Sequence, residues 1–108
     1  MKNTQDIRSV TMEWLMEDAI EDGAELSMAR MTVATNQVSE LHSHSNCTEA
    51  IHVLEGKIEQ RCGDKWIKLH KGDTCLIPKG FKHQTRNIGT ERAVLMLAYS
   101  SGSRIYET

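Results

Sequence analysis

The chain has 108 residues, of which 39% are hydrophobic and 26% are charged, and its formal net charge is -2. This length allows one domain around a single hydrophobic core, and the scattered Lys and Arg residues exclude the basic patch of a nucleic-acid or anionic-membrane binder. No segment approaches the roughly 20 apolar residues of a membrane-spanning helix, and the first residues lack the apolar run of a signal peptide, so we expect a cytoplasmic protein.

Residues 1–24 allow two interpretations. Apolar side chains recur there at the spacing of an amphipathic helix, namely Met12, Leu15, Met16, Ala19 and Ile20. Residues 10–17 fit an outer β-strand equally well, with residues 18–24 as a turn into the next strand. We expect the strand, so that residues 1–24 form an arm that packs on a barrel domain of residues 25–108.

From residue 25 onward, short apolar or alternating runs are separated by turn residues at intervals of about 8 to 12, which is typical of an all-β sandwich or barrel. The expected strands cover residues 25–35, 38–44, 49–55, 57–62, 65–70, 74–77, 83–88 and 92–100. No segment of helical length follows Gly23. The sequence therefore predicts an all-β fold.

Two of the connections have recognisable turn chemistry. Gly63 is the first central residue of a two-residue hairpin, where a type II′ turn needs the positive φ that glycine adopts without strain. Pro78 starts a turn that Gly80 closes, since proline fixes φ at the value that the first central position requires.

Histidine and glutamate side chains indicate a metal site. His42 and His44 are two residues apart, so on a strand they point to the same side, about 6.8 Å apart along the chain. A short turn brings Glu49, at the start of the next expected strand, back beside them, and His83 comes from a distant strand. Three imidazoles and one carboxylate suit a first-row divalent metal and leave coordination positions for water or substrate.

These residues, with the surrounding glycines, make the chain resemble a small single-domain cupin of the metal-binding type. The first cupin motif, G-x5-HxH-x4-E-x6-G, is matched by His42, His44, Glu49 and Gly56. The second motif, G-x5-PxG-x2-H-x3-N, is matched by Gly72, Pro78, Gly80, His83 and Asn87. The one departure is Asn36 in place of the first glycine, and asparagine tolerates left-handed backbone best after glycine, so we expect the turn to survive.

The resemblance implies an antiparallel jelly-roll barrel, a double-stranded β-helix, with a divalent transition metal near its wider mouth. It implies that His42, His44, Glu49 and His83 hold this ion, which is Fe, Mn, Ni or Zn. Many cupins form homodimers through outer strand faces. Residues 92–100 are apolar on both faces, which a homodimer explains.

Three further residues are candidates for binding a substrate: Gln60, Arg30 and Tyr99. Gln60 shares its strand face with apolar neighbours and should point inward. Arg30 points inward if Met28 does, where its guanidinium favours an anionic substrate, but the opposite face, with Met31 inward, fits nearly as well. Tyr99 and Tyr106 either carry protons in the reaction or only pack at the edge of the barrel.

The remaining histidines and the cysteines receive structural interpretations. His52 should face outward and His70 should be exposed. Three cysteines without a CxxC pair predict reduced thiols, not a disulfide framework. Cys62 and Cys75 should pack as small apolar side chains, whereas Cys47, in the loop between the expected ligands, is either a redox partner or inert.

Three functions are compatible with this site. The first is a metal-dependent enzyme that acts on a small oxygenated or anionic molecule, as a dioxygenase, decarboxylase, lyase or isomerase; a dioxygenase requires redox-active Fe, Ni or Cu. The second is a metal-dependent binding or sensing module without turnover. The third is a closed structural zinc site, which a barrel with its own core does not need in order to fold.

Overall fold

Nine β-strands form the regular structure of residues 3–7 and 10–108, the part of the chain that our computed structural model describes. In chain order they are β1 (Asn3–Ile7), β2 (Val10–Met16), β3 (Ser27–Val33), β4 (Glu49–Glu55), β5 (Lys57–Cys62), β6 (Lys65–His70), β7 (Thr74–Ile77), β8 (His83–Asn87) and β9 (Ala93–Tyr99). No helix occurs among these residues, so the all-β prediction is confirmed. The described part likewise contains no helix long and apolar enough to cross a membrane.

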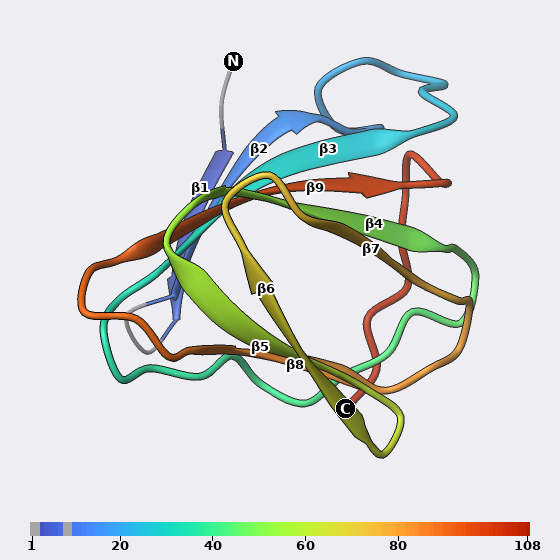
Figure 1. Cartoon of the computed structure of the whole chain (residues 1–108). Helices are drawn as coiled ribbons and strands as arrows, with labels where there is room; N and C mark the ends of the chain where they lie inside the picture. The colour runs from blue at the N-terminus through green and yellow to red at the C-terminus, as the bar shows by residue number, and fades with distance from the viewer. Residues whose placement is uncertain (1–2, 8–9) are drawn as a thin grey trace.

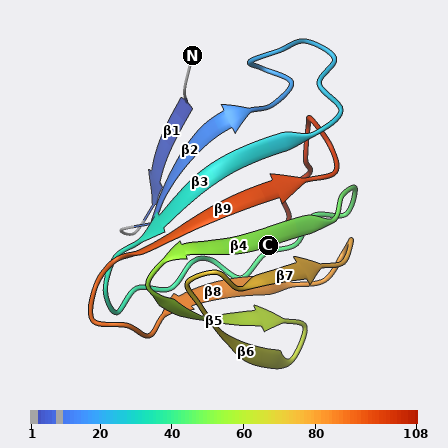
Figure 2. The ribbon, with the colours of Figure 1, turned by 45° about the horizontal axis from the view of Figure 1, so that its top comes forward.

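The strands form two antiparallel sheets that face each other across the molecule (Figure 1). The larger sheet has the order β1-β2-β3-β9-β4-β7, and the smaller sheet has the order β6-β5-β8. Figure 2 shows the long strands of the larger sheet side by side, with the smaller sheet beyond β4 and β7. This arrangement is the antiparallel jelly-roll barrel that the sequence predicts.

Side chains alternate between the inside and the outside of the barrel. In β4, Glu49, Ile51 and Val53 are buried, whereas the residues between them are half-buried. His52 faces outward as predicted, where its Nδ1 lies 2.6 Å from the Thr74 hydroxyl. The core between the two sheets consists of Val10, Trp14, Ala29, Met31, Val33, Cys47, Ile51, Val53, Ile58, Leu69, Ile77, Ala93, Leu95, Leu97 and Tyr99.

Residues 10–16 form a strand, so the helical interpretation of this segment is wrong. β2 pairs with β3 along its length, with Met12 opposite Met31 and Trp14 opposite Ala29. Its register shifts between Trp14 and Met16, which marks an irregularity in the pairing. This shift breaks the period of two around Leu15 and Met16, whereas Ala19 and Ile20, the other residues of the helical pattern, lie in the turn after the strand.

Residues 38–44 do not form the regular strand that we expect from the sequence. They make only isolated bridges, in which Val38 faces Arg86, His42 faces His83, and Ser43 faces Glu107. The backbone of this segment bonds first to β8 and then to the C-terminal residues, so no continuous ladder with one partner develops. The segment nevertheless lies along the free edge of β8.

The turns behave as the sequence indicates. Gly63 has φ 64°, and Asp64 is not among the positive-φ residues, which fits the type II′ hairpin between β5 and β6. Asn36 also has φ 64°, so it adopts the left-handed backbone of the glycine that it replaces. His70 is exposed, as expected.

Candidate metal centre

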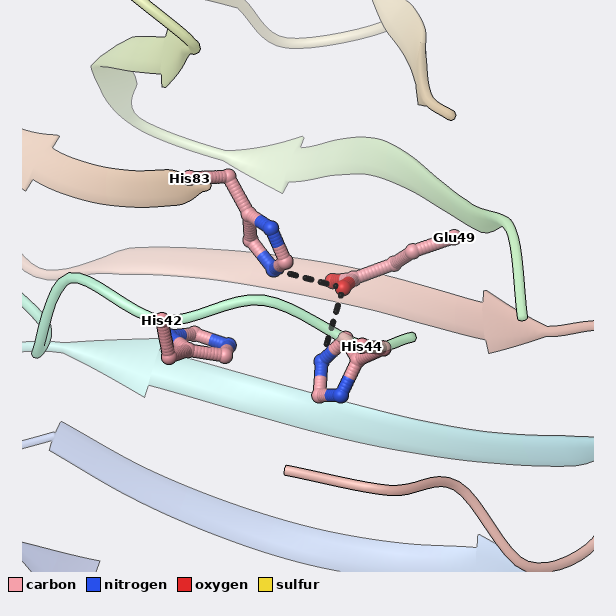
Figure 3. A group of neighbouring side chains, drawn as sticks. All are labelled: His42, His44, Glu49 and His83. Carbon is pink, nitrogen blue, oxygen red and sulfur yellow. Dashed lines mark ion pairs between the residues drawn. The ribbon is translucent and has the colours of Figure 1, made fainter. Parts of the chain in front are cut away.

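Four side chains from three separate parts of the chain converge inside the barrel (Figure 3). His42 and His44 lie between β3 and β4, Glu49 begins β4, and His83 begins β8. One potential ligand atom from each residue lies within 4.8 Å of the other three. The structure therefore brings together the four predicted ligands, although the first two histidines do not lie on a regular strand.

Backbone carbonyl groups fix the orientation of all three imidazole rings. In each ring Nδ1 lies at hydrogen-bond distance from a carbonyl oxygen: Glu40 for His42 (2.7 Å), Ile105 for His44 (2.8 Å) and Phe81 for His83 (3.0 Å). Because a carbonyl oxygen only accepts, Nδ1 is the atom that carries hydrogen in each ring. Nε2 of the neutral ring then offers a lone pair, which is how a histidine ligand is prepared for a metal.

Three buried acceptor atoms meet at the centre without a hydrogen-bond partner: His44 Nε2, Glu49 Oε1 and His83 Nε2. Glu49 Oε1 lies 2.9 Å from His83 Nε2 and 3.4 Å from His44 Nε2. Each of these residues is only 3% exposed. Lone pairs so close together, and away from water, repel one another unless a cation or a proton lies between them. The donor set therefore fits a divalent metal ion.

The pKa values of these groups follow from their burial and from their closeness to one another. Burial, followed by the charge of His83, lowers the pKa of His42 to about 4. Burial raises the pKa of Glu49, but the contacts with His44 and His83 outweigh it and lower this pKa to about 2. Burial lowers the pKa of His83, yet the Glu49 carboxylate outweighs burial, so the net shift is upward. A proton added to the metal-free site is thus favoured between His83 and Glu49 over His42.

A cavity of about 280 Å³ lies beside the four side chains and is lined by them. Its apolar wall consists of Val10, Met12, Trp14, Met31, Val38 and Leu97. Its polar wall consists of Ser39, Glu40, Thr85, Tyr99, Arg104 and Tyr106. The cavity offers space for a small molecule next to the potential ligand atoms.

The three predicted substrate residues have different positions. Tyr99 lines the cavity, and its buried ring packs 5.3 Å from the ring of His44. Gln60 points inward as predicted, but its amide oxygen accepts from Thr85 Oγ1 at 2.6 Å and the residue does not line the cavity. The inward orientation predicted for Arg30 is wrong, since this side chain is exposed and pairs with Glu13 at 3.2 Å. The alternative face of β3, with Met31 inward, is the buried one.

All three cysteines are free thiols, as predicted. Cys62 and Cys75 are half-buried and pack against the core. Cys47 is buried in the core and does not line the cavity. Burial and the nearby Glu49 carboxylate raise the pKa of its thiol, so it carries its proton at neutral pH.

Residues 101–108, which we call the C-terminal strap, contribute to the site in a way that the sequence does not reveal. The strap runs from the end of β9 to the segment that carries His42 and His44, where Glu107 bridges Ser43 (red in Figure 1). Its Tyr106 and Arg104 line the cavity, and its Ile105 carbonyl holds His44. Sequence reasoning identified only Tyr106 among these residues, because nothing in the pattern of residues 101–108 says where the segment folds back.

Comparison with protein families and curated proteins gives consistent matches. The family model described as the cupin domain matches residues 29–99. Germin-like protein 3-8 of Oryza sativa subsp. japonica is 33% identical over 81 residues, which is 70% of this chain and 36% of the relative. A probable germin-like protein, subfamily 2 member 5, of Arabidopsis thaliana is 36% identical over 81 residues, which is 70% of this chain and 38% of the relative. The chain thus spans well under half the length of these relatives.

Solved structures share the fold at low sequence identity. An oxalate oxidase structure superposes with a TM-score of 0.86 at 22% identity, covering 97% of this chain and 57% of the other. A mutant of Bacillus subtilis oxalate decarboxylase gives 0.88 at 18% identity, covering 98% of this chain and 29% of the other. A cupin-2 domain from Rhodospirillum rubrum gives 0.82 at 19% identity, covering 96% and 72%. At these identities the likeness establishes the jelly-roll fold alone.

Proposed function

This chain belongs to the cupin family, and we propose that it binds a divalent transition metal through His42, His44, Glu49 and His83 in order to act on a small oxygenated molecule. The observation that carries the proposal is the meeting of buried acceptor atoms, His44 Nε2, His83 Nε2 and Glu49 Oε1, without hydrogen-bond partners. A buried cluster of acceptors is costly unless a cation neutralises it. The three hydrogen bonds from Nδ1 to carbonyl oxygens support the same role, because they leave Nε2 free for the ion.

A bound ion supplies a Lewis acid and, if it is redox-active, a partner for dioxygen. The protein side chains position the bound molecule and exclude water from its surroundings. The apolar wall formed by Met12, Met31 and Leu97 offers water no hydrogen bonds, so a ligand with an apolar part displaces water there at little cost. Burial and the Glu49 carboxylate raise the pKa of Tyr99 well above 10, so its phenol remains a proton donor at the cavity wall.

We propose catalysis in preference to simple binding because four protein ligands leave positions open on an octahedral ion and a cavity adjoins them. The fold neighbours named oxalate oxidase and oxalate decarboxylase support this choice, since both names describe enzymes. The alternative is a metal-dependent binding or sensing module without turnover. It is favoured by the scarcity of acid-base groups at the cavity, where Tyr99, Tyr106 and Glu40 are the candidates beyond the predicted ligands.

The first experiment measures metal content. The purified protein should contain close to one transition metal ion per chain by elemental analysis, and the His83→Ala variant should lose most of it while keeping a β-rich circular dichroism spectrum. His70→Ala is the matched control, because His70 is exposed and pairs with Asp73 away from the site. Equal metal content in the wild type and the His83→Ala variant contradicts the proposed ligand set.

The second experiment separates enzyme from binder. Protein loaded anaerobically with Fe(II), and in parallel with Mn(II), is mixed with small hydroxy acids, diketones or phenols while oxygen uptake and product formation are followed. Turnover that disappears in His83→Ala supports an enzyme, and uptake of oxygen identifies an oxygenase. Stoichiometric ligand binding without product supports the binding module.

We also propose that the chain forms a homodimer through the outer face of its larger sheet. Leu76, Ala50, Ala98 and Met28 are directly opposed on β7, β4, β9 and β3, so they form an apolar row on that face. Leu76 is 64% exposed in the single chain. Light scattering should give a dimer mass that falls to the monomer for Leu76→Lys; a wild-type monomer at high micromolar concentration contradicts the dimer.

A further inference from the structure

The cavity beside the proposed metal site contains one guanidinium group, delivered by the C-terminal strap. Arg104 lines the cavity together with Tyr99 and Trp14. Among the described residues that line the cavity, it alone carries a permanent positive charge. It lies outside residues 29–99, the part that matches the family model.

Stacking on aromatic rings holds the Arg104 side chain in place. The guanidinium carbon lies 3.4 Å from the centre of the Trp14 ring and 5.5 Å from the centre of the Tyr99 ring. Tyr99 in turn packs against His44, so a single ring separates the guanidinium from the histidine cluster. A stacked guanidinium keeps its N–H groups in its own plane, and stacking therefore leaves these donors available for a planar acceptor.

The hydrogen-bond donors of Arg104 are poorly satisfied by the described part of the chain. Its one polar contact there is an ion pair with Glu17, in which Nη1 lies 3.7 Å from Glu17 Oε1, a distance longer than a hydrogen bond. The side chain is only 17% exposed. The two acidic groups that line the cavity are already engaged, since Glu49 faces the histidines and Glu40 accepts from Tyr106. A mostly buried guanidinium whose N–H groups are not used by hydrogen bonds favours an external anion, in addition to the longer ion pair with Glu17.

The rest of the cavity limits what this anion can be. Apolar side chains of β2, β3 and β9, among them Met12, Met31 and Leu97, form much of the remaining wall. A charged group placed against this wall lacks a partner, whereas an apolar body packs on it. The volume of about 280 Å³ limits the ligand to a small molecule.

We infer that Arg104 binds the carboxylate of a small monocarboxylic acid whose apolar body lies against the Met12, Met31 and Leu97 wall. This inference rests on the proposed function in that it names the ligand class of the same site. The carboxylate accepts hydrogen bonds from the guanidinium, and the body extends through the cavity that adjoins His42, His44, Glu49 and His83. Arg104 is thus the residue that selects the ligand by charge.

The experiment compares phenylacetate with its neutral isostere phenylacetamide by isothermal titration calorimetry, on zinc-loaded and on metal-free full-length protein. The wild type should bind phenylacetate at least about tenfold more tightly than phenylacetamide, because a charge-assisted pair is replaced by a neutral contact. Arg104→Gln should lose this preference, and Arg104→Lys, which keeps the charge without the planar fork, should retain part of it. Acetate, which lacks the apolar body, should bind at least about tenfold more weakly than phenylacetate.

Arg30→Gln is the matched control, since it removes the same charge from the outer face of β3 and should leave the preference unchanged. The inference is overturned if the wild type binds phenylacetamide as tightly as phenylacetate, if it binds neither, or if Arg104→Gln keeps the preference. Metal content, measured separately on each variant, distinguishes the two proposals. If the protein takes up no metal when zinc is added but shows the Arg104-dependent preference, the inference stands and the metal site is refuted. If it binds metal but shows no such preference, the metal site stands and the inference is refuted.

Discussion

The ring of Tyr106 is stacked on the ring of His42, with centroids 4.5 Å apart and planes inclined by 17°. The Tyr106 hydroxyl donates to the Glu40 carboxylate at 2.5 Å, and the Glu40 backbone carbonyl accepts from His42 Nδ1. Glu40 and Tyr106 therefore hold the same imidazole from two sides. Burial and the Glu40 carboxylate raise the pKa of Tyr106, so its phenol remains a donor at neutral pH.

The first prediction concerns this support. Tyr106→Leu removes both the stacking and the hydrogen bond to Glu40, so the His42 ring gains rotational freedom. Metal affinity should therefore fall by about tenfold, which is typical when a group that orients a metal ligand is lost. Tyr106→Phe keeps the ring and should lose less. Competition against a chromogenic chelator measures both variants, and wild-type affinity in Tyr106→Leu contradicts the supporting role of the strap.

A second prediction tests how the strap is attached. The backbone N–H of Asp18 donates to the carbonyl oxygen of Gly102 at 2.7 Å, and a side chain added at Gly102 clashes with the carbonyl oxygen of Ala24. Gly102→Ala should therefore lower the free energy of unfolding by about 1–3 kcal/mol, as overpacking commonly does. The change in midpoint of urea denaturation measures this loss.

Gly89→Ala is the control for the same substitution. A methyl group at Gly89 meets its nearest neighbour, Asn87 Oδ1, at 3.5 Å, an ordinary contact distance, so its stability should stay close to that of the wild type. If both alanine variants unfold at the same urea concentration, the close approach of the strap to Ala24 does not contribute to stability.

The barrel strands could be predicted from the sequence because their signals are local. β4, β5, β6 and β7 have the predicted bounds, since alternating runs between glycine turns fix both ends of each strand. The four converging side chains also follow from spacing, because His42, His44, Glu49 and His83 sit at strand ends or in segments that a barrel brings together.

The cavity wall could not be predicted because it depends on contacts between distant parts of the chain. β3 has apolar residues on both faces, so Met28 and Met31 gave no basis for choosing the face of Arg30. The guanidinium at the cavity comes instead from Arg104. The strap reaches the site through pairs such as Ile105 with His44 and Tyr106 with Glu40, which lie 61 and 66 residues apart. No periodicity encodes such pairs.

A third prediction separates stability from metal binding at Glu49. Glu49→Gln replaces an anion with a side chain whose NH₂ group donates to the lone pairs of His44 and His83. At pH 8 the metal-free variant should match wild-type stability within about 1 kcal/mol, since a new hydrogen bond offsets the lost charge interaction. Metal affinity should fall by about 100-fold, because an amide is a much weaker ligand for a divalent ion than a carboxylate.

Thermal denaturation and chelator competition on the same preparation test both parts. Glu59→Gln, in an exposed pair with Arg86, is the control and should change neither quantity appreciably. If the metal-free Glu49→Gln variant is unfolded, the Glu49 carboxylate is needed for folding. If the variant binds metal as tightly as the wild type, Glu49 is not a metal ligand.

The fourth prediction is the pH dependence of stability in the metal-free protein. The pKa of His42 is about 4 in the folded state against 6.5 ordinarily, so the unfolded chain binds the extra proton and stability falls as pH drops from 6.5 to 4. The pKa of Glu49 is lowered from 4.5 to about 2, which adds a further loss below pH 4.5. The pKa of His83 is raised, so its contribution is complete below 6.5 and is lost as pH rises through its folded value.

Urea denaturation in EDTA across this range should therefore give a maximum near pH 6.5. The titrations are coupled, because His42, His83 and Glu49 face one another, so the profile belongs to the cluster and not to one residue. Saturating metal should move the maximum to higher pH, since an ion takes the place of the proton between His83 and Glu49 and competes best when the imidazoles are neutral. If the stability of the metal-free protein keeps rising as the pH falls from 6.5 to 5, the cluster is not the site that takes up the proton. If metal does not move the maximum, the cluster is not the site that binds the metal.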